Sequence, residues 1–219
     1  MLFRSLDIVM ISIDKFYSRV MPYVQGCPEP TASQAILDAA IEFCDKTNVM
    51  RQTLDTFFTS KDVVDYDIDL PSRQLRVSKI LTVCLDDDKL SGVFEQDSYY
   101  LPNREGKPTG YYTRRVDEAL TLRFNVTPDD RYSVEVSAAL SPTRSATSIE
   151  SDLYDYWGDA IVSEAIAKLA SMPQTVFFNP ALAVEMSNKS REQCHTARIE
   201  SQQGKVLGGT RVRLRPLVR

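Results

Sequence analysis

Histidine is almost absent from this chain of 219 residues, which contains only His195. A catalytic triad or a histidine-rich metal site would have to be built on this single side chain. The preceding Cys194 would not face it, because adjacent residues of a helix point in directions about 100° apart. We interpret His195 as a surface residue, and the sequence predicts no catalytic residue, metal ligand or cofactor site.

Patterns that serve phosphate binding, disulfide frameworks and membrane insertion are also missing. The 8 glycines form neither GxGxxG nor GxxxxGK[ST], and nothing approaches the roughly 20 apolar residues that span a membrane. Asp7 and Asp14 interrupt the apolar N-terminal run, so we expect no signal peptide. The four cysteines are irregularly spaced without a CxxC pair, which predicts reduced, mostly buried cytosolic thiols. They are Cys27, Cys44, Cys84 and Cys194.

Two short segments resemble ligand sites but have simpler interpretations. Asp65, Asp67 and Asp69 begin like a calcium loop, but the required Gly and Glu positions hold Leu70 and Arg76. Their alternation with apolar residues predicts a solvated sheet face. "GYYTRR", residues 110–115, mixes aromatic and basic side chains and could stack on bases, but no wider basic surface accompanies it.

Charge is distributed unevenly along the chain. The net charge is -4, yet the last sixteen residues hold five basic side chains and no acid, which leaves 21 basic against 30 acidic side chains elsewhere. An acidic body with a basic tail favours head-to-tail joining or insertion of the tail into an acidic partner. A terminal edge strand with solvated arginines is an equal alternative. The basic residues are Lys205, Arg211, Arg213, Arg215 and Arg219.

Helical patterns frame the chain at both ends. Ser12 can cap a short helix, and an apolar helix follows the "GCPEP" turn within residues 26–47. "TSIE", residues 147–150, reads as a capping box in which Thr147 and Glu150 bond each other's backbone N–H. Asn179 as N-cap and Pro180 predict a last helix up to Gly204, roughly 36 Å long at about 1.5 Å per residue.

The middle third has the period of two that is typical of strands. Residues 74–85 are β-prone, and a slip in their alternation near Ser78 and Lys79 indicates a bulge or a strand buried on both faces. "DDDKL", residues 86–90, predicts a turn. Thr127 to Asp130 separates two alternating runs, so we expect a hairpin there. The sequence thus predicts an antiparallel β module between helices.

Several weak signatures follow one another in a fixed order along nearly the whole chain. They are "GCP", "ILDAAIEFCDKT", "GKPTGYY", "ALTLRFNVTPDD", "YDYWGDAIVSEAIAKLASMP" and "FFNPALAVEMSNKSREQCHTARIES". Their order resembles that of the head-to-tail adaptor (connector, or neck) proteins of tailed bacteriophages, especially the short-tailed ones, although no single string is invariant.

The resemblance implies an α+β fold: a helical bundle of about four helices, the last one long, with an inserted antiparallel β module and an extended C-terminal arm. The expected parts are 1–61, N-terminal helices; 62–141, β module; 142–204, C-terminal helices; and 205–219, the arm. Ile36, Ile41 and Phe43 would be covered partly by the bundle, through the helix at 147–171, and partly by a neighbouring subunit.

The resemblance also implies a non-enzymatic virion protein of the neck, assembled in the host bacterial cytoplasm, with no cofactor and no membrane contact. Subunits would form a homo-oligomeric ring, usually of twelve, that joins the portal to the tail and continues the DNA channel. The arm residues Lys205, Arg211, Arg213, Arg215 and Arg219 would bind the portal protein. The thin apolar stripe of the last helix would line the subunit interface, through Leu182, Met186, Cys194 and Ala197.

The β module's partner stays open between a tail nozzle, a fibre and a neighbouring subunit, and double-stranded DNA would be a transient contact. Three alternatives to the adaptor also stay open. One is a cell-wall hydrolase built on carboxylates or a lone cysteine. Another is a nucleic-acid-binding module that uses Arg114, Arg115 and the tail. The third is another neck component, such as a tail-completion protein.

Overall fold

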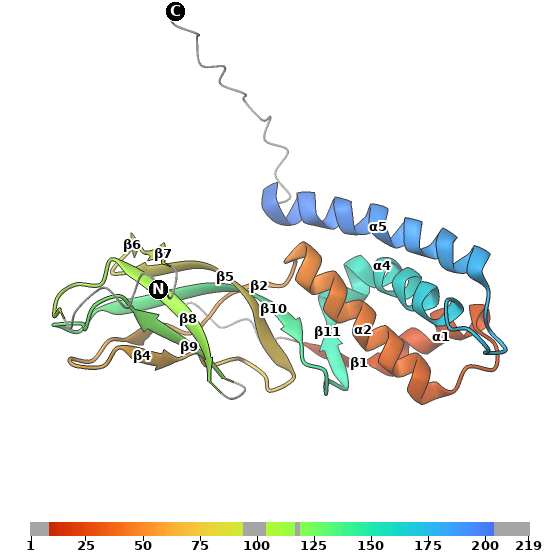
Figure 1. Ribbon diagram of the computed structural model, residues 1–219, viewed down its shortest axis with the longest axis horizontal. Helices are drawn as coiled ribbons and strands as arrows, with labels where there is room; N and C mark the ends of the chain where they lie inside the picture. The colour runs from red at the N-terminus through yellow and green to blue at the C-terminus, as the bar shows by residue number, and fades with distance from the viewer. Residues whose placement is uncertain (1–8, 94–103, 117–118, 204–219) are drawn as a thin grey trace, which may run out of the picture.

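The computed structural model describes residues 9–93, 104–116 and 119–203 and places helices at one end and most strands at the other (Figure 1). The helical part contains α1 (Tyr17–Val20), α2 (Glu29–Thr47), α4 (Ser151–Ala170) and α5 (Pro180–Gln203), with 3-10 turns at Ile13–Phe16 and Met21–Tyr23. The strands are β1 (Met10–Ser12), β2 (Arg51–Thr53), β3 (Phe57–Phe58), β4 (Asp65–Asp67), β5 (Leu75–Leu85), β6 (Asp88–Lys89), β7 (Ser91–Gly92), β8 (Gly110–Val116), β9 (Ala119–Phe124), β10 (Ser133–Pro142) and β11 (Ser148–Glu150).

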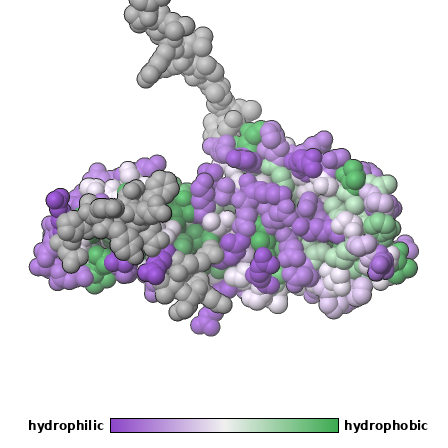
Figure 2. Space-filling view, viewed as in Figure 1, coloured by the Kyte–Doolittle hydropathy of each residue, from purple (hydrophilic) through white to green (hydrophobic). Residues whose placement is uncertain are grey.

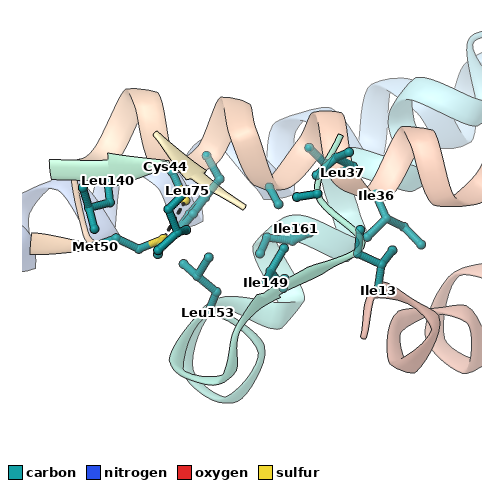
Figure 3. Close-up of a cluster of buried hydrophobic side chains, with 14 of the residues drawn as sticks. Ile13, Ile36, Leu37, Cys44, Met50, Leu75, Leu140, Ile149, Leu153 and Ile161 are labelled. Carbon is teal, nitrogen blue, oxygen red and sulfur yellow. Dashed lines mark hydrogen bonds between the residues drawn. The ribbon is translucent and has the colours of Figure 1, made fainter. Parts of the chain in front are cut away.

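The core of the helical part is formed by α2, α4 and α5 together with buried side chains from the segment 13–24. The hydroxyl of Ser12 accepts a hydrogen bond from the Asp14 N–H at 3.3 Å and caps the first 3-10 turn, as its sequence predicts. Phe43 lies 2% exposed and its ring is 5.7 Å from that of Trp157, centroid to centroid, so the expected packing of α2 on α4 is present. Buried aliphatic side chains from helices and strands fill the space between them (Figure 3).

The long helix α5 begins as its sequence predicts, because Asn179 Oδ1 accepts the Leu182 N–H at 3.1 Å. It packs along α4 and also contacts α2, so both lie beneath it in Figure 1. Near its end, the Ser201 hydroxyl donates to the Thr47 carbonyl at 2.7 Å. This bond holds the C-terminal end of α5 against the C-terminal end of α2.

The capping box predicted at residues 147–150 is wrong. These residues extend as β11, which pairs with β1 so that Ile149 lies opposite Ile11. Gln74 Oε1 accepts the N–H groups of Thr147 and Ser148, and the N-cap of α4 is Glu150, whose side chain makes no capping bond. Strand pairing and the buried Ile149 outweigh a local cap, whose contribution is only about 1 kcal/mol.

The hairpin predicted around residues 127–130 is wrong as well. Strand β9 pairs with β8 and β4, whereas β10 pairs with β5, β2 and β3, so the two runs belong to different sheets. The hydroxyl of Thr59 donates to the Asp130 carbonyl at 2.9 Å and accepts the Tyr132 N–H at 2.8 Å. This buried threonine therefore holds the connection between β9 and β10 on a path from one sheet to the other.

The β part consists of two sheets with the strand orders β2-β10-β5-β6 and β4-β9-β8-β7, and β3 pairs beside β10. Phe57 of the first sheet stacks on Tyr66 of the second at 5.4 Å, and Tyr66 meets Phe124 at 5.5 Å, between ring centroids. Two aspartates with left-handed backbone, Asp86 (φ 48) and Asp87 (φ 69), form the predicted turn between β5 and β6.

The bulge predicted in residues 74–85 is confirmed. The register of β5 against β10 shifts twice, and the residues passed over are Ser78 and Leu81. Each bulge leaves one residue without an opposite partner and turns the strand locally. The first bulge brings Ser78 and Lys79 beside the end of α2, where they line a shared recess.

The fold is mixed α+β, but the expected arrangement as a helical bundle with an inserted antiparallel β module is wrong. Among the described residues, α1 has a single turn, and helix α2 packs on strand β10 as well as on helices. Strands also occur in the helical part, where β1 pairs with β11. The β part is not wholly antiparallel, because its strand β7 pairs with β8 in parallel. Strand β2 starts at Arg51, upstream of residue 62, and the arm at 205–219 lies outside the described residues.

Candidate functional site

A recess with several unpaired basic side chains lies where α2, β5 and α5 meet. It has a volume of about 510 Å³, in the range of ligand pockets. Three separate elements contribute its walls: the end of α2, the bulged middle of β5 and the second half of α5. We call it the basic recess, and it is lined by Asp45, Lys46, Asn48, Ser78, Lys79, Cys194, His195 and Arg198.

Local structure explains how these walls are held. Asn48 has left-handed backbone (φ 53) and its N–H bonds the Cys44 carbonyl at 2.9 Å, which ends α2. Asp45, one turn earlier, accepts hydrogen bonds from Arg76 Nη2 at 2.6 Å and from the Ser78 hydroxyl at 2.7 Å. Both partners belong to β5, so this carboxylate ties the strand to the helix.

The charges in the basic recess do not balance. The carboxylate of Asp45 is already occupied by Arg76, and Lys46 forms an ion pair with Glu42. Lys79 and Arg198 are exposed and make no ion pair within the described residues, and His195 is exposed beside them. The concave surface therefore presents uncompensated positive charge in an otherwise acidic chain.

A second recess of about 470 Å³ lies on the other side of Lys46 and contains a group of paired charges. Lys168 Nζ lies 2.6 Å from Glu42 Oε2, and Lys46 binds the other oxygen of the same carboxylate. Burial raises the pKa of Glu42, but the two lysines outweigh it and hold that pKa below its usual value. The hydrogen bond to Glu42 raises the pKa of Lys46. Glu42, Lys46 and Lys168 thus form an ion-pair network in this recess.

A third recess, of about 520 Å³, separates β5 from β8. Tyr111, Tyr112 and Thr113 of the "GYYTRR" segment line it, and burial raises the pKa of Tyr111. Arg114 is exposed, and the Arg115 side chain lies outside the described residues. Lys79 is shared with the basic recess, so the two recesses meet at the bulge of β5.

The cysteines are free, and none of them has the environment of an activated nucleophile. Cys27 and Cys44 are buried. Burial raises the pKa of Cys194, which keeps its thiol protonated at neutral pH, and it raises the pKa of Cys44 further. His195 is exposed on α5, in agreement with its interpretation as a surface residue.

The carboxylates give no grouped site in the part of the chain that the structure describes. Asp65 and Asp67 are exposed, and they contact Arg123 and Thr121 of the neighbouring strand, as expected of a solvated sheet face. No cluster of three or more histidine, cysteine or acidic side chains capable of holding a metal occurs across residues 9–93, 104–116 and 119–203. Burial, followed by the charge of Asp152, raises the pKa of Glu150, which lines none of the three recesses.

The stripe predicted to form a subunit interface faces the chain's own core. Ala197 is 0% exposed, and the other three residues pack, partly buried, against the same hydrophobic cluster. They are Leu182, Met186 and Cys194. Ile36 and Phe43 are likewise covered within the chain, at 0% and 2% exposure, and Ile41 is partly buried against the core.

The outer surface near α5 carries apolar side chains that the sequence analysis did not single out. Val184 is 62% and Ile199 41% exposed on α5. The loop before this helix holds Val176, 92% exposed, and Phe178, and Figure 2 shows hydrophobic surface at that end of the molecule. The predicted arm residues lie outside the described residues: Lys205, Arg211, Arg213, Arg215 and Arg219.

Sequence reasoning also missed the basic recess, because its cations come from segments more than a hundred residues apart. The one available signal was the slip in alternation at Ser78 and Lys79.

Comparison with models of known families finds no match for this chain, and no curated protein matches it significantly in sequence. Within the described residues, no helix combines the length and apolar character needed to cross a membrane.

Proposed function

We propose that this protein is a head-to-tail adaptor of a tailed bacteriophage, a structural subunit of a ring that joins the portal to the tail and continues the DNA channel. The observation that carries the proposal is the position of α5. This helix of 24 residues lies on the outside of the helical part and leads directly into the basic segment 204–219. A long, partly exposed helix followed by a basic tail suits a wall of an assembly with a docking arm.

Contacts between subunits would use the outer face of α5 rather than its apolar stripe. The inner stripe is occupied by the chain's own core, whereas Val184 and Ile199 are open to a neighbour. The exposed side chains of Val176 and Phe178, in the loop before α5, add apolar surface at the N-terminal end of this helix.

The charge of the body favours a channel wall over a DNA-binding module. Without the last sixteen residues the chain holds 21 basic against 30 acidic side chains. Phosphates that pass an acidic wall are not retained, whereas a basic wall binds them. Double-stranded DNA is therefore proposed as a transient contact of the assembled ring.

The decisive experiment measures the mass by light scattering after size exclusion, for the protein alone and mixed with its portal ring. The proposal expects a complex with one adaptor per portal subunit. The absence of any complex between the protein and the portal ring would contradict the proposal. Steep loss of DNA binding with added salt would then favour the nucleic-acid-binding alternative, and hydrolysis of cell-wall material would favour the hydrolase.

Removal of residues 204–219 tests the arm separately. The truncated chain should keep its cooperative unfolding transition, because the segment lies beyond the end of α5, and it should lose portal binding. Full-length protein in which only the five basic residues are replaced by Gln is the matched control for charge. Portal binding by the truncated chain would contradict the role of the arm.

A further inference from the structure

The basic recess has no function in the proposal above, and its chemistry points to a carboxylate ligand. Lys79 projects from β5 and Arg198 from α5, and neither has an ionic partner in the described residues. His195 adds a further N–H donor at the same wall. The only acid in the lining, Asp45, is already held by Arg76 and Ser78. The recess can therefore accept negative charge from outside without losing an internal bond.

The opposite end of the same strand presents negative charge on a rigid turn. Asp86 and Asp87 both have left-handed backbone, and Asp86 is fixed through its N–H to the Ser133 carbonyl at 2.9 Å. Its carboxylate also accepts the Ser133 N–H at 2.8 Å. Asp88 pairs with Lys107 at 2.7 Å, so Asp87 is the exposed carboxylate of the turn without an ionic partner.

The acidic character of this end extends beyond the turn, and we call it the acidic tip. Hydrogen bonding to Asp129 raises the pKa of Tyr132 to about 12, and the charges of Asp130 and Asp86 add to it. Five aspartates at this end outnumber the basic side chains Lys89, Lys107 and Arg131. The aspartates are Asp86, Asp87, Asp88, Asp129 and Asp130.

The acidic tip cannot reach the basic recess of its own chain. Lys79 lies in the middle of β5 and Asp87 just beyond its end, eight residues further along one strand. At about 3.3 Å per residue this is a separation of roughly 26 Å along a paired strand. A contact between the two surfaces therefore needs two molecules.

We propose that the basic recess binds the acidic tip, at Asp87, of a second copy of this chain. Tip and recess are different surfaces, so the contact is heterologous and continues from copy to copy, closing into a ring or extending as a filament. This inference rests on the proposed ring function and adds a charged contact between subunits to the contact proposed for the outer face of α5. A single exposed ion pair contributes little to the free energy of association. The concave recess attracts the acidic turn more strongly because several basic side chains act on it together.

The contact is tested by reversing the charge on each surface and then mixing the two variants, which restores opposite charges across it. Asp87→Lys and the double variant Lys79→Glu/Arg198→Glu should each weaken self-association about tenfold or more, and the two chains mixed should associate again. Asp69→Lys and Lys61→Glu are the matched controls, because both residues are exposed and lie just outside the two ends of β4. Both variants should associate normally. Equal self-association by all variants, or failure of the mixture to recover, would overturn the contact.

A native thiol in the recess permits a second test that needs no stable assembly. In a Cys84→Ser chain, Asp87→Cys should form an intermolecular disulfide with Cys194 under mild oxidation, faster than Asp69→Cys does. Added Cys194→Ala should abolish the crosslinked band on a non-reducing gel. Equal crosslinking from positions 69 and 87 would overturn the proposal. It would also be overturned if the Asp87→Cys chain crosslinked only at the background level and the recess instead bound DNA, with that binding abolished by Lys79→Glu/Arg198→Glu.

The outcomes separate this inference from the proposed function. Portal-bound rings that form normally with Asp87→Lys would refute the contact and leave the adaptor function standing. Crosslinking between positions 87 and 194 in a protein that ignores the portal would support the contact and refute the function.

Discussion

The two ends of the molecule are stabilised in different ways. Among the described residues, nine of the twelve largest fully buried side chains belong to the helical part, for example Phe16, Ile36 and Leu169. The other three, Leu85, Leu122 and Leu140, belong to the β part. The helical part thus depends on deep apolar packing, in which every methylene group contributes about 0.8 kcal/mol.

The β part depends more on polar side chains that bond its loops. Tyr66 Oη donates to the Val63 carbonyl at 2.8 Å, and Asn125 Oδ1 accepts the Gly110 N–H at 3.1 Å. Thr59, 1% exposed, joins the connection between the two sheets to β3. Fewer of the largest fully buried side chains lie in these two sheets, and specific hydrogen bonds hold the loops between their strands. Substitutions should therefore act through packing at one end and through unpaired polar groups at the other.

The largest effect is expected from Phe43→Ala in the helical core. Phe43 is 2% exposed and packs on Trp157, so its loss should lower the free energy of unfolding by about 3–5 kcal/mol. Urea unfolding followed by circular dichroism measures it. Phe58→Ala is the control, because Phe58 is 50% exposed, and its effect should be much smaller. Equal effects of the two substitutions would contradict the difference in packing.

Thr59→Val should give the largest effect of a single polar group in the β part. The variant keeps the shape but leaves the Tyr132 N–H and the Asp130 carbonyl without their partner, at a cost of about 1–3 kcal/mol. Thr53→Val, which loses only an exposed bond to Ser137, should cost less. Hydrogen exchange of the Tyr132 amide reports the change directly. An unchanged exchange rate would show that the threonine does not hold this connection.

Glu42→Gln should make stability less dependent on pH. The pKa of Glu42 is lower in the folded than in the unfolded chain. The Glu42 carboxylate therefore stabilises the fold fully above about pH 4.5, and this stabilisation disappears as the pH falls through the folded pKa. The variant should be less stable than the parent at pH 7 and equal to it at low pH, by thermal unfolding. Asp88→Asn, at the exposed tip, should have a smaller effect that added salt removes. A destabilisation of Glu42→Gln that persists at low pH would exclude charge as the cause.

The smallest effect concerns the titration of one side chain and not stability. Asp129→Asn should lower the pKa of Tyr132 from about 12 toward 10, because the carboxylate is its main cause. Ultraviolet absorbance of the phenolate measures this, with Tyr132→Phe identifying the signal. Asp65→Asn, on another strand, should leave the titration unchanged. A pKa unmoved in Asp129→Asn would place the cause elsewhere.

Features decided by adjacent residues were predictable from the sequence. The cap at Ser12, the N-cap at Asn179, the turn at Asp86 and Asp87 and the bulge at Ser78 all follow local chemistry. Each depends on the conformational preference of a few neighbouring residues, and no distant segment opposes it.

Predictions failed where a distant segment competed for the same backbone groups. The 147–150 segment has the residues of a capping box, but pairing with β1 and bonds to Gln74 extend it. Residues 127–130 have the chemistry of a hairpin turn, but Thr59 diverts the chain into the other sheet. The predicted bundle failed for the same reason, because strands β1, β10 and β11 contribute to the packing of the helices.

The sequence by itself determined the composition, the uneven charge, the single histidine and most element positions, because these depend on residue identity and short spacing. Only the tertiary structure decided the sheet partners, the inward orientation of the α5 stripe and the gathering of Lys46, Lys79 and Arg198 in one recess. Such contacts join residues far apart in the chain, and their free energy depends on how α2, β5 and α5 pack together. Local preference carries no information about that packing.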